Sequence, residues 1–135
     1  LEGQGLTATI QRFATTLAGE KGLPLTFSAP HAERKLAPDA SVAVFRVAQE
    51  ALENAVRHSQ ATEVRVTVAF VPNGLSVTVE DDGVGVDVEQ AMARAVQHQT
   101  AGIMGMLERA EMLGGWLRFE SKLGKGTSVE LYAPL

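Results

Sequence analysis

The run from Leu75 to Asp81 constrains the fold more than any other part of this sequence. Its residues alternate between apolar and polar, as in a strand with one buried face. A period of two places Leu75, Val77 and Val79 on that face and puts Asp81 on the same side. A carboxylate directed at a core costs several kcal/mol unless hydrogen bonds or charge compensate it. The strand therefore predicts a polar group at the floor of a pocket.

Two glycines follow this strand in the segment Asp82-Gly83-Val84-Gly85. Glycine lets the backbone turn sharply or approach a ligand closely. An ordinary turn explains the same residues, because Asp-Gly sequences are common in turns. The segment alone leaves both interpretations open, a ligand pocket and a simple turn.

The rest of the chain predicts helices interspersed with strands. Hydrophobic spacing and turn residues indicate helices over residues 5–18, 39–58 and 102–113, and a short one over 88–98. The same signals indicate strands over residues 25–28, 63–71, 75–81, 116–121 and 127–133. This order predicts an α/β (α+β) two-layer sandwich, in which helices cover one face of a mixed, mostly antiparallel sheet.

The composition indicates one globular domain and excludes several classes of protein. The 135 residues are 45% hydrophobic, and a net charge of −4 with scattered basic residues predicts no nucleic-acid partner. Every apolar run is shorter than the roughly 18 residues that cross a membrane. The chain has no cysteine, which excludes disulfides and thiolate chemistry. Because it opens on Leu1 rather than Met, we expect a piece of a longer protein.

The long helix predicted over residues 39–58 carries a charged stripe opposite its apolar arc. The stripe consists of Arg46, Glu50, Glu53 and Arg57. Asn54 lies at its boundary, one turn beyond Glu50. A solvated face with a Glu53–Arg57 ion pair explains the charges but not an asparagine in mid-helix. Glu50 and Asn54 together would offer oxygen ligands to a hard cation such as Mg²⁺.

Two later features are weak signals when taken alone. Gly102 and Gly105 open a helix, where free N–H groups and the positive helix end favour phosphate. Their spacing matches neither the Walker loop nor the dinucleotide fingerprint. Thr127 falls on the inward face of the last strand, where a hydrogen bond to the backbone is the simpler explanation.

In order, the chain carries Glu50-x-x-x-Asn54, Asp81-x-Gly83-x-Gly85, Gly102-x-x-Gly105 and Gly126-Thr127. This series resembles the N, G1 and G2 boxes and the terminal threonine of the Bergerat-fold ATPases. That family includes gyrase, the large heat-shock chaperone, mismatch-repair ATPases and sensor histidine kinases. The resemblance covers residues 5–135, nearly the whole chain.

Two stretches narrow the resemblance to one subgroup of histidine kinases. The segments 45–58 and 105–110 are similar to kinases paired with response regulators that carry a LuxR-type helix-turn-helix output. The resemblance implies a base pocket in which Asp81 accepts a hydrogen bond from the adenine amino group of ATP. Gly83 and Gly85 would shape that pocket, and Thr127 would support its adenine end.

The resemblance also implies a phosphate end. Asn54 would hold Mg²⁺ against the triphosphate, with Glu50 acting through the metal or its water. Arg57 and His58 would contact phosphate, although His58 also fits the negative end of a helix dipole. Gly102 and Gly105 would give backbone N–H groups to the phosphates, and residues 86–101 would form a lid.

The implied protein is the catalytic ATP-binding domain of a two-component sensor histidine kinase, spanning residues 1–135. It would donate the γ-phosphoryl group of Mg-ATP to a histidine on dimerisation helices preceding Leu1, for relay to a response regulator. We expect a cytoplasmic domain that is monomeric and almost inactive alone, with no membrane contact of its own, even if the full-length protein is membrane-anchored. A serine kinase of the anti-sigma-factor type and a regulatory module that binds nucleotide without transfer are the alternatives. A gyrase-like ATPase fits less well, because the lid is too short for a dimer-forming arm.

Overall fold

The computed structural model describes residues 5–30, 34–58, 60–90, 92–93 and 101–135. Its elements are α1 (Leu6–Glu20), β1 (Leu25–Ser28), α2 (Pro38–Glu53), the π-helical turn η1 (Asn54–His58), β2 (Val64–Val71), β3 (Gly74–Asp81), α4 (Ala101–Met112), β4 (Trp116–Lys122) and β5 (Gly126–Pro134). The predicted strands are all present, and their ends agree with the prediction to within one residue.

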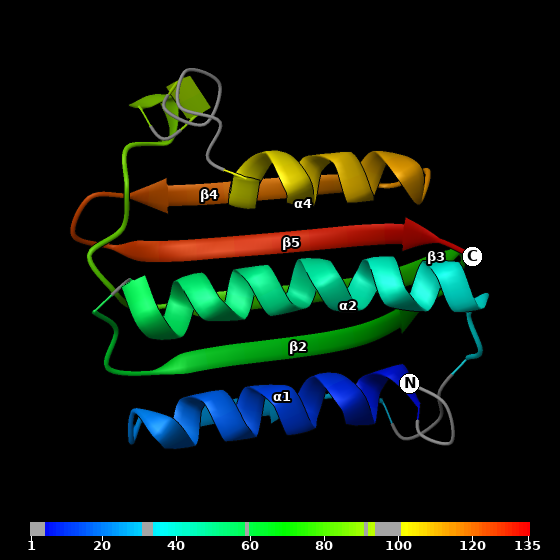
Figure 1. Ribbon diagram of the computed structural model, residues 1–135, viewed down its shortest axis with the longest axis horizontal. Coiled ribbons are helices and arrows are strands. Elements are labelled where there is room, and N and C mark those ends of the chain that lie inside the picture. Colours follow the sequence, from blue (N-terminus) through cyan, green and yellow to red (C-terminus); the bar gives the residue numbers. More distant parts are fainter. Residues whose placement is uncertain (1–4, 31–33, 59, 91, 94–100) are drawn as a thin grey trace.

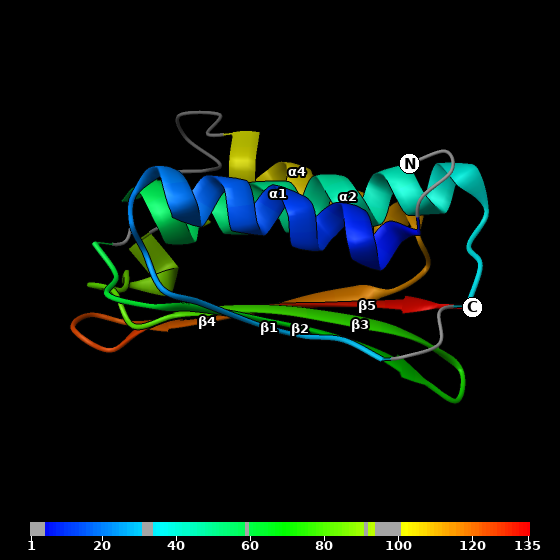
Figure 2. The same cartoon turned by 90° about the horizontal axis from the view of Figure 1, so that it is seen from below.

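The five strands form one sheet in the order β1-β2-β3-β5-β4. β1 and β2 run parallel because α2 lies between them in the chain, and all other neighbours are antiparallel. Helices α1, α2 and α4 lie side by side across the sheet (Figure 1), and all three cover the same face (Figure 2). The predicted two-layer architecture is confirmed.

The core lies between these two layers. Helix α1 buries residues spaced three and four apart, including Leu6, Ile10 and Leu17, because this spacing returns to one side of a helix. Helix α2 begins at Pro38, which suits a first helical position. The largest fully buried side chains come from both layers and are Ile10, Leu52, Leu75, Met106, Leu131, Val44, Val47, Val64 and Val66. No helix in the described ranges is long and apolar enough to cross a membrane.

The prediction of one continuous helix over residues 39–58 is wrong in its last turn. The α-helix ends at Glu53, and η1 continues it as a π-helix. A π turn holds more residues than an α turn, so the side chains of η1 are rotated away from the predicted stripe. Arg57 accordingly lies toward α1, where its Nη2 is 3.8 Å from Glu20 Oε1, and is not paired with Glu53.

The short helix predicted over residues 88–98 is observed only in part. Residues 88–90 and 92–93 are helical, and residues 91 and 94–98 lie outside the described part of the chain. The Gln90 N–H donates to Asp87 Oδ1 at 3.0 Å, which is one half of a capping box.

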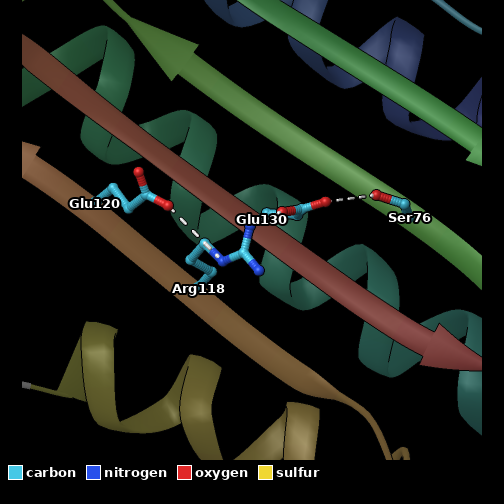
Figure 3. A network of polar contacts seen from close by, with 4 residues as sticks. All are labelled: Ser76, Arg118, Glu120 and Glu130. Atoms are coloured by element: carbon cyan, nitrogen blue, oxygen red, sulfur yellow. Dashed lines mark hydrogen bonds and ion pairs between the residues drawn. The ribbon is translucent and has the colours of Figure 1, made fainter.

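The sheet face opposite the helices is polar. Glu130 on β5 links two neighbouring strands there: it accepts hydrogen bonds from Ser76 at 3.2 Å and from Arg118 at 3.3 Å. Arg118 also lies 3.7 Å from Glu120, and Figure 3 shows this network in front of the strands with α2 behind them. A face of charged and hydroxyl side chains is compatible with water, which explains how the fold remains stable with helices on one side only.

Candidate functional site

Three polar side chains form one row across the inner face of the sheet. Asp81 on β3 is directly opposite Thr127 on β5, which is opposite Ser121 on β4. In each of the three strands the polar residue lies at or next to one end. It continues the row of inward-facing apolar residues, such as Val79 and Val129. The ends of α2 and β3 and the starts of α4 and β5 meet on the same side of the molecule (Figure 1). The row is therefore placed where loops and helix ends converge.

A cavity of about 190 Å³ lies over Asp81 and Thr127 of this row. Its walls are mostly apolar, contributed by Val79, Val86, Ile103, Phe119 and Val129 together with the alanines of α2 and η1. Its polar lining consists of Asn54, Asp81 and Thr127. Pockets for drug-sized ligands enclose roughly 300–1,000 Å³, so this space suits one flat ring system of a larger ligand.

A larger hollow of about 670 Å³ lies at the same end of the molecule. Its lining includes Arg65, Glu80, Glu120 and Ser128, which lie on the face turned away from the helices, and it also reaches the row of Asp81, Ser121 and Thr127. Charges of both signs line this hollow, so it does not favour a single type of ligand. The smaller cavity is the better candidate because it combines apolar walls with a few convergent polar groups.

Asp81 belongs both to a turn and to a pocket, the two possibilities that the sequence left open. Its Oδ1 accepts a hydrogen bond from the Gly83 N–H at 2.8 Å, as in an Asx turn. The same side chain lines the cavity. The turn therefore holds the carboxylate in place at the cavity floor.

Gly85 contacts the β4–β5 hairpin. Its φ of +68° favours glycine, and a Cβ built there would lie 2.0 Å from the Lys122 carbonyl oxygen. Beside it, the Gly124 N–H donates to the Val84 carbonyl at 2.6 Å. Gly83 and Gly85 are both buried, and neither lines the cavity directly. They shape it by fixing the path of the loop behind it.

Asp82 has a structural role that the sequence analysis missed. Its carboxylate accepts hydrogen bonds from the Thr62 hydroxyl, from the Thr62 N–H at 2.8 Å and from the Glu63 N–H at 3.0 Å. The hydrogen bond from the Thr62 hydroxyl, followed by those from the two backbone N–H groups, lowers the pKa of the Asp82 carboxyl below its usual value. Asp82 thereby fastens the start of β2 to the end of β3.

The predicted phosphate residues do not all lie at the cavity. Asn54 lines the cavity from η1, and Glu50 lies against the first turn of α4, since a Cβ on Gly102 would be 2.2 Å from Glu50 Oε1. Gly105 lies beneath the end of Arg109, whose Nη1 would be 2.9 Å from an added Cβ. Arg57 lies toward α1, apart from the cavity. The His58 side chain and residues 91 and 94–100 of the expected lid lie outside the described part of the structure.

The donor types at this end of the cavity fit a magnesium ion shared with a ligand. In the described ranges no three His, Cys, Asp or Glu side chains gather as a metal site. Mg²⁺ is often held by one or two protein oxygens together with substrate phosphates and water, so a full protein cage is not required. Glu50 and Asn54 supply a carboxylate and an amide of this kind.

Ser121 is the second residue that the sequence analysis missed. Alternation along β4 places Leu117 and Phe119 on the inner face, and Ser121 follows them as Asp81 follows Val79. This alternation was visible in the sequence. That Ser121 is next to Thr127 depends on the pairing of the strands.

Comparison with known proteins identifies the family. Residues 39–135 match the family described as histidine kinase-, DNA gyrase B-, and HSP90-like ATPase. This match covers well over half of the chain, and the chain belongs to this family. The predicted resemblance is therefore confirmed.

Two curated relatives are sensor kinases of Bacillus subtilis (strain 168). The histidine-protein kinase/phosphatase DegS is 31% identical over 138 residues, which cover 100% of this chain and 35% of DegS. The sensor histidine kinase ComP is 38% identical over 93 residues, which cover 69% of this chain and 12% of ComP. The chain thus spans about a third or less of the length of these relatives.

A solved structure shares the fold. The histidine kinase domain from the Erythrobacter litoralis EL346 blue-light activated histidine kinase superposes with a TM-score of 0.76 at 22% identity. The match covers 96% of this chain and 61% of that one.

Proposed function

We propose that residues 1–135 form the catalytic ATP-binding domain of a two-component sensor histidine kinase, of the subgroup paired with LuxR-type response regulators. The observation that carries the proposal is the cavity over Asp81 and Thr127, which has apolar walls for a flat base and acceptor groups at its floor. Family membership and the names of the relatives support the same assignment.

The base would enter the cavity between the apolar side chains and the sheet. Asp81, held by the Gly83 N–H, would accept a hydrogen bond from the amino group of adenine. A fixed carboxylate in a largely apolar space distinguishes ligands strongly, because a base without a matching donor cannot form a hydrogen bond to it.

The triphosphate would extend toward the start of α4. Gly102 adds no side chain of its own to this helix end, which lies against Glu50, and N–H groups of a first helical turn favour phosphate oxygens. Asn54 and Glu50 would hold Mg²⁺, which neutralises phosphate charge in phosphoryl transfer. These residues would orient the γ-phosphoryl group toward the acceptor.

The acceptor would be a histidine of the protein's own dimerisation domain, and a response regulator would take the phosphoryl group next. We expect a cytoplasmic domain that is monomeric as a fragment and transfers little by itself. Incubation with [γ-³²P]ATP and the full-length protein's dimerisation region should yield an acid-labile phosphohistidine. An acid-stable product would indicate the serine-kinase alternative, and binding without transfer would indicate a regulatory module.

The first test is calorimetric titration of Mg-ATP into the parent domain, into Asp81→Asn and into Asp82→Asn. The parent and Asp82→Asn should bind Mg-ATP. Asp81→Asn should lose at least about tenfold in affinity, because its NH₂ group replaces one carboxylate oxygen and cannot accept a hydrogen bond from the base. The control matches the change in charge and the sequence position, but Asp82 does not line the cavity. No binding by the parent, or equal binding by both variants, would contradict the proposal.

A further inference from the structure

Ser121 lies on the inner face of β4, next to the end of the strand. None of the family motifs gives its hydroxyl a role. The residue is half-buried, and its Oγ has three polar neighbours. The Val86 N–H donates to it at 2.8 Å, the Gly126 carbonyl oxygen lies 3.0 Å away, and Thr127 Oγ1 lies 2.8 Å away.

The number of protons fixes the direction of these hydrogen bonds. A serine hydroxyl has one proton to donate and two lone pairs that accept. The Gly126 carbonyl can only accept, so the Ser121 proton goes to it. The lone pairs of Ser121 then accept from the Val86 N–H and from the Thr127 hydroxyl. If Ser121 donated to Thr127 instead, two acceptor oxygens would face each other 3.0 Å apart with no proton between them.

This arrangement decides what Thr127 presents to the cavity. Its only hydroxyl proton is directed at Ser121, so Thr127 offers lone pairs to a ligand. Asp81, opposite Thr127 in the register, is also an acceptor because a carboxylate has no proton to give. These two residues therefore present only acceptors at this corner of the cavity.

We propose that Ser121 is a specificity-determining residue for the nucleobase, acting through the proton of Thr127. This inference rests on the proposed function. A purine with an amino group on its six-membered ring, as in adenine, supplies the donor that this corner needs. A purine with a carbonyl at that position, as in hypoxanthine or guanine, would place a third acceptor against the other two.

The test compares the dissociation constants of ATP and inosine triphosphate, in which a carbonyl replaces the amino group. Calorimetric titrations with Mg²⁺ would use the parent domain, Ser121→Ala and Ser121→Thr. The parent should prefer ATP by at least about tenfold. In Ser121→Ala the Thr127 proton is free to turn toward the carbonyl, and the preference should fall about tenfold. Ser121→Thr keeps the hydroxyl and should keep the preference.

The ratio of the two constants separates specificity from general damage. Loss of the hydrogen bond to Val86 would weaken the binding of both nucleotides equally and leave the ratio of their dissociation constants unchanged. An unchanged ratio in Ser121→Ala, with ATP binding retained by the parent, overturns the inference and leaves the proposed function standing. A parent that binds neither nucleotide overturns both. If circular dichroism shows that Ser121→Ala is unfolded, Ser121→Cys takes its place, because a thiol is a weak acceptor of similar shape, and the same two outcomes apply.

Discussion

Asp81 and Asp82 are adjacent in the chain, but their carboxylates have different surroundings. Asp81 ends the inner face of β3 and lines the cavity, whereas Asp82 is exposed and accepts hydrogen bonds from Thr62 and Glu63. The cause is the alternation of a strand, which turns successive side chains to opposite sides. At the scale of the residue, one carboxylate is placed for a ligand and its neighbour is placed for the fold.

The lowered pKa of Asp82 predicts how its contribution to stability depends on pH. Because the folded state holds the ionised form, this contribution is present above the ordinary carboxyl pKa of about 4 and is lost as pH falls through the lower folded pKa. Asp82→Asn should therefore lower the urea midpoint at neutral pH, and the difference from the parent should shrink in acid. A difference that is constant with pH would contradict the assignment.

Gly102 leaves no room for a side chain beside Glu50. An alanine there would place its Cβ 2.2 Å from Glu50 Oε1, so the carboxylate must move. Gly102→Ala should reduce phosphotransfer to the dimerisation region by about tenfold or more, and the shorter Glu50→Asp in the same chain should recover part of that loss.

Gly105→Ala is the matched control, because among the described residues its new Cβ would meet only the flexible end of Arg109. If both alanine variants lose the same activity, and Glu50→Asp recovers neither, the glycines act through backbone access to phosphate alone.

At the scale of the element, the β4–β5 hairpin supports the loop that follows Asp81. Ser121 accepts from the Val86 N–H, and the Gly124 N–H donates to the Val84 carbonyl. Gly85 fits between these two contacts, with no room for a side chain beside Lys122. The hairpin therefore determines the position of one wall of the cavity.

A comparison of Gly85 and Gly124 distinguishes the cost of backbone strain from the cost of lack of space. Both Gly85 and Gly124 have positive φ, but a Cβ added at Gly85 would meet the Lys122 carbonyl oxygen, whereas one added at Gly124 would meet nothing within 4 Å among the described residues. Gly124→Ala should cost about 1–2 kcal/mol for the left-handed conformation alone. Gly85→Ala should cost at least about 1 kcal/mol more in the free energy of unfolding, measured by urea denaturation. Equal costs would show that the loop moves away from the hairpin easily.

At the scale of the whole molecule, the cavity exists only when the two layers are docked. Its walls come from the sheet on one side and from α2, η1 and α4 on the other. A ligand that fills this space binds the folded chain and not the unfolded one. Binding should therefore raise the stability of the whole domain.

A thermal denaturation series tests this coupling. Mg-ATP at about a hundredfold above its dissociation constant should add about 2.7 kcal/mol and raise the Tm by several degrees. Removing the metal with EDTA should reduce the rise in the parent. In Asn54→Ala the rise should be small with or without EDTA, whereas Asn73→Ala, in the turn between β2 and β3, should behave as the parent. A rise in Asn54→Ala that still depends on Mg²⁺ would remove Asn54 from the metal site.

Much of this fold is encoded locally, and so the sequence alone was sufficient to predict it. The strands, the apolar arcs of the helices and the inward direction of Asp81 and Thr127 follow from periods of two and 3.6 residues. The order of the glycine, asparagine and acidic motifs was sufficient to indicate the family, which the family match confirms.

Which of these residues are in contact depends on how the elements pack together. The strand order β1-β2-β3-β5-β4 places Ser121 next to Thr127 and Thr127 next to Asp81, although Ser121 and Asp81 are 40 positions apart in the chain. The packing of α4 on α2 brings Glu50 to Gly102, and the π turn directs Arg57 to Glu20. Local periodicity fixes the face on which a side chain lies. Its neighbours on that face depend on long-range pairing and helix packing, which are properties of the assembled chain.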